Sequence, residues 1–238
     1  MANVLLVSFP FPPSGTVGVR RALAYVRYLR LHGCGVSVLT ATSPQTSGYD
    51  ADLSKTISGD VRVYRAWNPE LPFAFRDRAW KRMMAALSGR VKDSTAHAAQ
   101  NRGQRPWMET KIRSAAQRLL FPDPQTTWVP FATHKALKII RSDGIDPIVL
   151  NVPPFSTLKI GIALKRAIPP IKIVTDFRDE WLDYYLSQID DPTPQKIRLA
   201  EKLEQQIVRA SSYVSTVTPE WVQRLRRRYP AEPANKFI

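Results

Sequence analysis

The densest set of reactive side chains in the sequence is the run 176–181. Asp176 and Asp179 lie on either side of Arg178. A carboxylate in such a run could accept a proton from a hydroxyl nucleophile, and the guanidinium could bind an anion or hold a carboxylate in a forked pair. The same charges could instead form an ion-pair network that only fixes a loop, with Trp181 as packing. The residue types therefore allow two interpretations, catalysis at Asp176 or Asp179 and a purely structural loop.

A second candidate is the loop after the first apolar run, where Ser14, Gly15 and Gly18 precede Arg20 and Arg21. Glycine lets the backbone approach a ligand closely, and the start of a helix attracts anions. Two arginines in a first helical turn oppose the helix dipole at a cost of roughly a few tenths of a kcal/mol each, which favours a phosphate or carboxylate ligand. The spacing matches neither the dinucleotide-binding glycine pattern nor a P-loop. A tight turn with solvated arginines is the alternative.

The alternation of strand and helix patterns places both candidates at one edge of a sheet. Short loops join these elements, so the sequence predicts an α/β fold with a Rossmann-like, doubly wound parallel sheet. Such sheets bind ligands at the carboxyl ends of their strands, and the loops 14–21, 153–156 and 176–181 are expected to line one cleft there. Apolar runs predict strands over 4–7, 36–39, 61–64, 148–152, 171–175 and 213–217, with a further strand starting at 236. Helices are predicted up to Gly33 and over 131–141, 157–167 with Ser156 as N-cap, 194–210, and 219–229 with Thr218 as N-cap.

The positive charge is concentrated in one segment. The chain carries 35 Lys and Arg against 20 Asp and Glu, a net charge of +15, and residues 61–120 hold 13 of the basic and four of the acidic residues, or +9. We expect residues 67–130 to be a helical insertion in a single domain, 1–238. Its cationic helix with aromatic residues suits a membrane interface, whereas a solvated basic surface helix is the alternative. The residues predicted to contact an anionic membrane are Phe73, Phe75, Arg76, Arg78, Trp80, Lys81 and Arg82.

Several classes of protein do not fit the composition. No apolar run approaches the roughly 20 residues that span a bilayer, and the N-terminus lacks the pattern of a signal peptide. Cys34 is the only cysteine, so no internal disulfide can form, which fits a reducing cytoplasm. The three scattered histidines give no zinc spacing, and no covalent hydrolase arrangement is evident. We therefore expect no metal.

Several short motifs follow one another along nearly the whole chain. They are 4–8 with Phe11-Pro12-Pro13-Ser14-Gly15, Gly18 and Arg20-Arg21; His32-Gly33 before 36–40; Pro122-Asp123-Pro124 with Trp128; Pro153-Pro154-Phe155-Ser156; 176–181; and Thr218-Pro219 before Tyr229-Pro230 and Lys236-Phe237-Ile238. Their order resembles family 4 glycosyltransferases of the GT-B fold, and the D-F-R-D-x-W segment, 176–181, resembles a subgroup of that family.

The resemblance implies a retaining, metal-independent transfer of a sugar from a nucleotide-sugar to an acceptor, without a cofactor. The chain would be the N-terminal, acceptor-side half of a GT-B enzyme, with the donor-binding domain expected beyond residue 238. Many such enzymes act on lipid-linked or cell-envelope polysaccharide acceptors, so we expect a cytoplasmic protein at the inner membrane face. The first loop would approach the donor phosphate and be exposed and mobile in this chain. The donor-phosphate residues would be Ser14, Gly15, Gly18, Arg20 and Arg21, and the acceptor residues Pro154, Phe155, Ser156, Arg178 and Trp181.

Two other functions compete with this one. The basic segment with Trp80 and Trp107 would suit a non-enzymatic Rossmann-like module that binds nucleic acid or anionic surfaces, although no recognised nucleic-acid motif is present. A nicotinamide-dependent enzyme is disfavoured because the dinucleotide fingerprint is missing.

Overall fold

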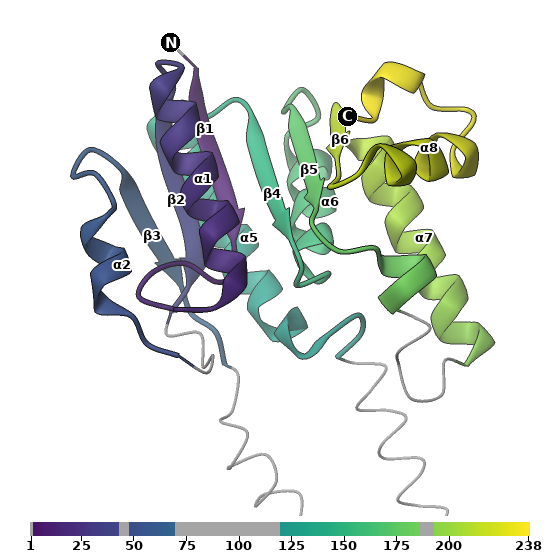
Figure 1. The fold of residues 1–238 in the computed structure, drawn as a ribbon, viewed down its shortest axis with the longest axis horizontal. Helices are drawn as coiled ribbons and strands as arrows, with labels where there is room; N and C mark the ends of the chain where they lie inside the picture. The colour runs from purple at the N-terminus through teal and green to yellow at the C-terminus, as the bar shows by residue number, and fades with distance from the viewer. Residues whose placement is uncertain (1, 43–47, 70–119, 186–192) are drawn as a thin grey trace, which may run out of the picture.

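The computed structural model describes residues 2–42, 48–69, 120–185 and 193–238. In these residues, parallel strands form one sheet in the order β3-β2-β1-β4-β5-β6 (Figure 1). This arrangement confirms the predicted Rossmann-like, doubly wound parallel sheet. The strands are β1 (Asn3–Ser8), β2 (Gly35–Ala41), β3 (Arg62–Ala66), β4 (Ile148–Val152), β5 (Ile173–Phe177) and β6 (Tyr213–Ser215).

Helices cover both faces of the sheet (Figure 1). The α-helices are α1 (Val17–Leu31), α2 (Ala51–Lys55), α5 (Val129–Asp143), α6 (Thr157–Ala167), α7 (Pro194–Ala210) and α8 (Pro219–Arg228). Shorter helical turns are η1 (Pro124–Trp128), η2 (Trp181–Tyr185) and η4 (Ala234–Lys236). Most of the predicted insertion 67–130, including its cationic helix, lies outside the described residues, so the insertion stays a prediction.

The core has two layers because the central strand alternates its side chains between the two faces. Leu5 and Val7 pack with α5, α6 and α7 on one face. Val4 and Leu6 pack with α1 on the other. Since both faces of β1 are covered, its side chains from Val4 onward are buried, as an uninterrupted apolar run predicts.

Helix ends follow local rules that the sequence shows. Gly33 adopts φ 74° after α1, and Gly144 adopts φ 59° after α5, the left-handed region in which glycine is favoured. Thr218 caps α8 by accepting a hydrogen bond from the Trp221 N–H at 3.2 Å, with Pro219 at the first helical position.

Strand β5 differs from its prediction at the position that concerns the site. It was expected to end at Thr175, but it runs to Phe177 and takes Asp176 into the sheet. The prediction stopped at the first charged residue, because an unpaired charge is costly inside a sheet. Asp176 is accommodated because a distant arginine pairs with it.

Candidate functional site

The candidate site lies where the carboxyl ends of β1 and β4 meet at the centre of the sheet. The chain leaves β1 toward α1 on one face and β4 toward α6 on the other, and open α/β sheets bind ligands at such a switch point. The strand register aligns one polar residue from each of four neighbouring strands. These residues are Ser8, Asn151, Asp176 and Ser215.

The loop between β1 and α1 is fixed by backbone hydrogen bonds. The Gly15 N–H donates to the Gly48 carbonyl at 3.1 Å, and the Asp50 N–H donates to the Pro13 carbonyl at 2.8 Å. Gly15 is exposed, as expected, whereas Ser14 and Gly18 are buried, so the prediction of an exposed loop is correct for only part of it. The loop therefore presents Gly15 to solvent while Ser14 belongs to its support.

Gly18 marks a close approach between α1 and Arg178. A methyl group added at Gly18 would overlap Nη1 of Arg178 and lie 3.3 Å from Cγ of Pro10. The N-cap residue Thr16 makes no side-chain hydrogen bond to the helix. The positive end of α1 thus begins against a guanidinium group, without a side-chain cap from Thr16.

The two arginines of α1 point to different environments. Arg20 is exposed and has no ion pair with an acidic side chain among the residues in the structure's described ranges. Arg21 turns toward the sheet, where its Nε donates to Oδ2 of Asp176 at 2.6 Å and its Nη2 to Oδ1 at 2.5 Å. This forked pair satisfies Arg21 within the chain and leaves Arg20 as the cation that a ligand could reach.

The two aspartates of the 176–181 run also differ. The Asp176 side chain is fully buried, and its Oδ1 accepts a further hydrogen bond from the Ser215 hydroxyl at 3.1 Å. Asp179 is 54% exposed and lies 3.4 Å from Nη2 of Arg178. In this arrangement, Asp179 is the carboxylate that an acceptor hydroxyl could meet.

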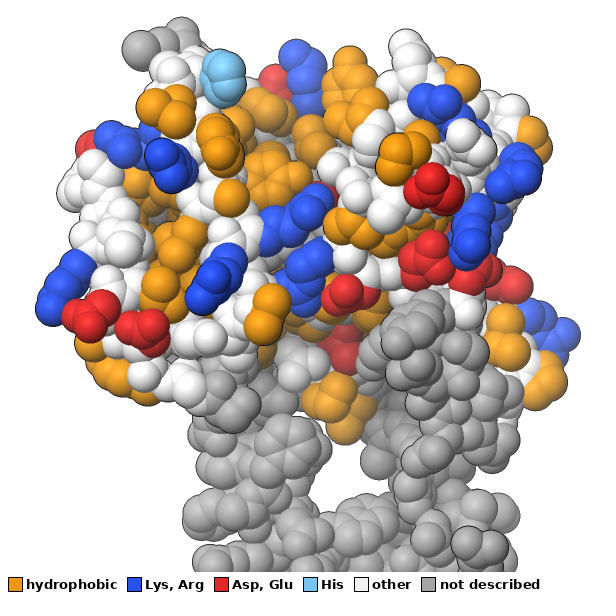
Figure 2. All heavy atoms as spheres, in the orientation of Figure 1, with side chains coloured by type: hydrophobic (Ala, Val, Ile, Leu, Met, Phe, Trp, Pro, Cys, Tyr) orange, Lys and Arg blue, Asp and Glu red, His pale blue; other side chains and the backbone are white. Residues whose placement is uncertain are grey.

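Arg178 lies between these groups as a poorly compensated cation. Its side chain is 24% exposed, and within the described part of the chain its buried Nη1 has no hydrogen-bond partner. Figure 2 shows the face of the molecule that carries α1. Lys and Arg side chains lie in the middle of this face, with Asp and Glu side chains beside them. A guanidinium next to the positive end of a helix favours an anion such as a phosphate.

Three of the five predicted acceptor residues lie in the core. The rings of Phe155 and Trp181 stack at 4.8 Å with an interplanar angle of 12°, and both side chains are about fully buried. Ser156 is buried too, whereas Pro154 is half-buried. The structure brings Pro154 and Arg178 nearest to the surface, while Phe155 and Trp181 pack beneath them.

Helix α6 is stabilised at its start by Asp123 and not by the predicted Ser156 cap. Ser156 has helical backbone angles and makes no capping hydrogen bond with its side chain. Its N–H donates to Oδ2 of Asp123 at 2.9 Å, and a carboxylate is favourable at a helix N-terminus. Burial raises the pKa of Asp123, an effect that the hydrogen bond from the Ser156 N–H opposes.

Sequence reasoning missed the polar row beneath α1. Asn151 is fully buried and donates from Nδ2 to the Ser8 hydroxyl at 2.9 Å. Ser215 and Tyr25 face Asp176. The sequence signal for this row was a polar residue at the last or next-to-last position of each of the strands β1, β4, β5 and β6. No single motif contains these four residues.

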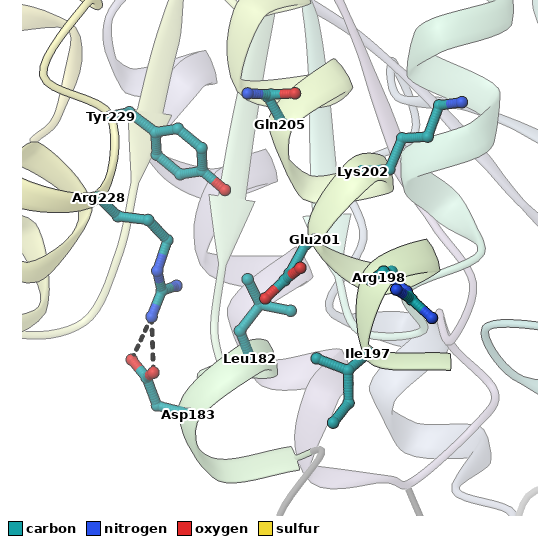
Figure 3. A pocket seen from close by; sticks show the side chains of 9 residues that line it. All are labelled: Leu182, Asp183, Ile197, Arg198, Glu201, Lys202, Gln205, Arg228 and Tyr229. Carbon is teal, nitrogen blue, oxygen red and sulfur yellow. Dashed lines mark hydrogen bonds and ion pairs between the residues drawn. The ribbon is translucent and has the colours of Figure 1, made fainter. Parts of the chain in front are cut away.

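A hollow of about 600 Å³ lies between η2, α7 and α8 (Figure 3). Arg228 donates from Nη2 to both oxygens of Asp183 at 2.6 Å, and its Nη1 donates to Glu204 at 3.0 Å. Arg228 and Asp183, which line this hollow, thus satisfy each other's charge, which makes it a weaker candidate than the strand ends.

The membrane prediction falls outside the described residues, because Phe73, Phe75, Arg76, Arg78, Trp80, Lys81 and Arg82 all lie in the segment 70–119. Among the helices that the structure does describe, none has the length and apolar character to cross a bilayer.

Comparisons with solved structures agree on the architecture. The chain matches sucrose-phosphate synthase from Thermosynechococcus elongatus with a TM-score of 0.55 at 14% identity, over 95% of this chain and 45% of that chain. It matches UGT2 of Phytolacca americana, complexed with UDP-2fluoro-glucose and pterostilbene, with a TM-score of 0.53 at 10% identity, over 99% of this chain and 52% of that chain. The apo form of UGT2 gives a TM-score of 0.50 at 10% identity, over 98% of this chain and 50% of that chain.

The chain spans about half the length of these structures. No family model matches the sequence, and no curated protein matches it. At such low identity the likeness shows a shared fold, which is that of one half of a GT-B chain.

Proposed function

We propose that the chain is the acceptor-side domain of a GT-B glycosyltransferase that transfers a sugar from a nucleotide-sugar to an acceptor. The reaction would retain the anomeric configuration, need no metal and require a donor-binding domain. The shared fold supports this proposal, and one observation of the site carries it. Nη1 of Arg178 is buried beside Gly18, at the start of α1, with no hydrogen-bond partner among the described residues. A donor diphosphate would supply the hydrogen-bond acceptor that this nitrogen lacks.

The residues of the site divide into two groups in this proposal. Gly15, Gly18, Arg20 and Arg178 would face the donor phosphate, with Ser14 and Arg21 supporting them from inside the fold. On the acceptor side, Asp179 would accept a hydrogen bond from the reacting hydroxyl. Pro154 would lie against the acceptor, and the buried residues Phe155, Ser156 and Trp181 would hold that edge in place.

The anion site can be tested with inorganic pyrophosphate as the probe. Pyrophosphate added to the isolated chain should shift the backbone amide NMR signals of the first turn of α1, with weak affinity because the second domain's contacts are missing. Gly18→Ala should weaken this binding about tenfold, equivalent to roughly 1.4 kcal/mol, because the new methyl group displaces the Arg178 guanidinium.

Gly59→Ala is the matched control, because a methyl group at Gly59 meets no atom within 4 Å. It should leave pyrophosphate binding unchanged. If the amides of α1 do not respond to pyrophosphate in the wild-type chain, the proposed donor site is wrong. Equal binding by the Gly18→Ala and wild-type chains would reject Gly18 and Arg178 as its centre.

We further propose that the basic segment contacts an anionic membrane surface, which would bring the site to a lipid-linked or cell-envelope polysaccharide acceptor at the cytoplasmic face. Neutralising Arg76, Arg78, Lys81 and Arg82 together should reduce binding to vesicles that contain anionic lipid, since each basic residue near such a surface contributes about 1 kcal/mol. Sedimentation with anionic and neutral vesicles measures the effect. Unchanged vesicle binding by the fourfold variant would refute the membrane contact, and salt-dependent binding of nucleic acid without vesicle binding would favour the non-enzymatic module.

A further inference from the structure

The ion pair of Arg21 and Asp176 lies directly behind the proposed anion site. The Asp176 side chain has no exposed surface, and that of Arg21 is 31% exposed. Each carboxylate oxygen of Asp176 accepts from a different nitrogen of Arg21, and Ser215 donates to one of them. Because both oxygens are engaged and buried, Asp176 holds α1, β5 and β6 together at this edge of the sheet.

Tyr25 closes the same cluster one helical turn after Arg21. Its hydroxyl faces Asp176 and Ser215, and burial, followed by the charge of Asp176, raises the pKa of Tyr25 to about 12. The phenol therefore stays protonated at neutral pH and can donate to its acidic neighbour.

Both α1 and β5 connect this cluster to Arg178. Gly18 and Arg21 are three residues apart in α1, so they share a face of the helix. Asp176 contacts Arg21, and Arg178, the residue after the end of β5, contacts Gly18, so both side chains lie toward α1. The forked pair therefore fixes the first turn of α1 at the distance at which Gly18 meets the Arg178 guanidinium.

We propose that Arg21 and Asp176, supported by Tyr25 and Ser215, are positioning residues that set the Arg178 guanidinium against the start of α1 for anion binding. The inference rests on the proposed donor-phosphate site. It gives Asp176 a role through Arg178 and leaves Asp179 as the carboxylate that contacts the acceptor.

Two variants that break the fork in different ways test the proposal. Asp176→Asn keeps the size of the side chain but removes its charge, and Arg21→Lys keeps the charge but cannot form the fork. Each should weaken pyrophosphate binding about tenfold, measured from the amide shifts of α1. Arg27→Lys, an exchange at an exposed position of the same helix, should not change binding. Circular dichroism and thermal unfolding establish whether each variant is folded. If Asp176→Asn does not fold, Arg21→Lys alone provides the binding test.

A double-mutant cycle separates positioning from general support of the fold. Arg178→Ala should itself weaken pyrophosphate binding, and Arg21→Lys should add little in the Arg178→Ala background, because its effect passes through Arg178. Equal losses from Arg21→Lys with and without Arg178 would overturn the positioning role, as would wild-type affinity in folded Asp176→Asn and Arg21→Lys chains. If the wild-type chain binds pyrophosphate and Arg178→Ala does not alter it, the proposed donor site fails, and the positioning role with it.

Discussion

Replacement of Arg228 by methionine should lower the free energy of unfolding by about 3 kcal/mol, because it leaves a buried carboxylate without its cation. The Glu204 side chain is only 3% exposed. It accepts hydrogen bonds from Nη1 of Arg228 at 3.0 Å and from the Tyr229 hydroxyl at 2.7 Å. Burial already raises the pKa of Glu204, and Tyr229 and Arg228 counteract this effect. Urea unfolding at pH 7 would measure the loss.

The matched control is Arg224→Met in the same helix. Arg224 is 52% exposed and pairs with Glu180 at 3.4 Å, and such surface pairs contribute about 1 kcal/mol at most. A second arm adds Glu204→Leu to Arg228→Met, which should recover much of the loss because it removes the unpaired charge. If Arg228→Met costs no more than Arg224→Met, the buried pair is not a main support of α8.

The loss should also depend on pH. A carboxylate whose folded-state pKa lies above its unfolded value favours folding when it is protonated, so stability is gained as pH falls through the folded pKa and lost as pH rises through it. Without Arg228, the pKa of Glu204 should rise further. The difference in stability between wild type and Arg228→Met should therefore shrink as the pH is lowered from 7 toward 5.

This network also connects the C-terminal helix to the candidate site. Arg228 holds Asp183 in η2, the turn that begins at Trp181 (Figure 3). Trp181 in turn packs on Phe155 in the loop after β4. The loops after β4 and β5 are thus fixed by contacts from α8, which lies outside the site itself.

The fold was predictable because its signals are local. The strand 148–152 and the helices 157–167 and 194–210 match β4, α6 and α7 to the residue. An apolar run predicts β4, and proline marks the start of α7 at Pro194, so signals within a few residues of the chain locate these elements. The parallel sheet follows from their alternation.

The site was less predictable because its contacts join distant residues. Arg21 and Asp176 are 155 positions apart, so nothing near either residue shows that the two are paired. Taken alone, Arg21 looked like a ligand for an anion and Asp176 like a loop residue able to act as a base. Because they pair with each other, Arg21 and Asp176 are structural supports, and the exposed neighbours Arg20 and Asp179 are left for a substrate.

Trp181→Ala should cost about 3–5 kcal/mol of unfolding free energy, the usual loss for removing a large buried aromatic side chain. Trp181 is 1% exposed and stacks on Phe155 at 4.8 Å, with the Phe121 ring 6.4 Å away. Trp181→Phe keeps a ring against Phe155 and should retain most of the stability. Chemical denaturation followed by circular dichroism compares the three proteins.

Trp67→Ala is the matched control, because Trp67 is 59% exposed and its ring meets that of Phe131 edge-on at 4.7 Å. It should cost less than about 1 kcal/mol, as for other surface substitutions. Similar small losses at both tryptophans would mean that Trp181 is not a core residue and could stack on an acceptor directly. A large loss at Trp181 alone would make its contribution to acceptor binding indirect, through the position of Phe155 and Pro154, and would leave the direct contacts to Pro154, Arg178 and Asp179.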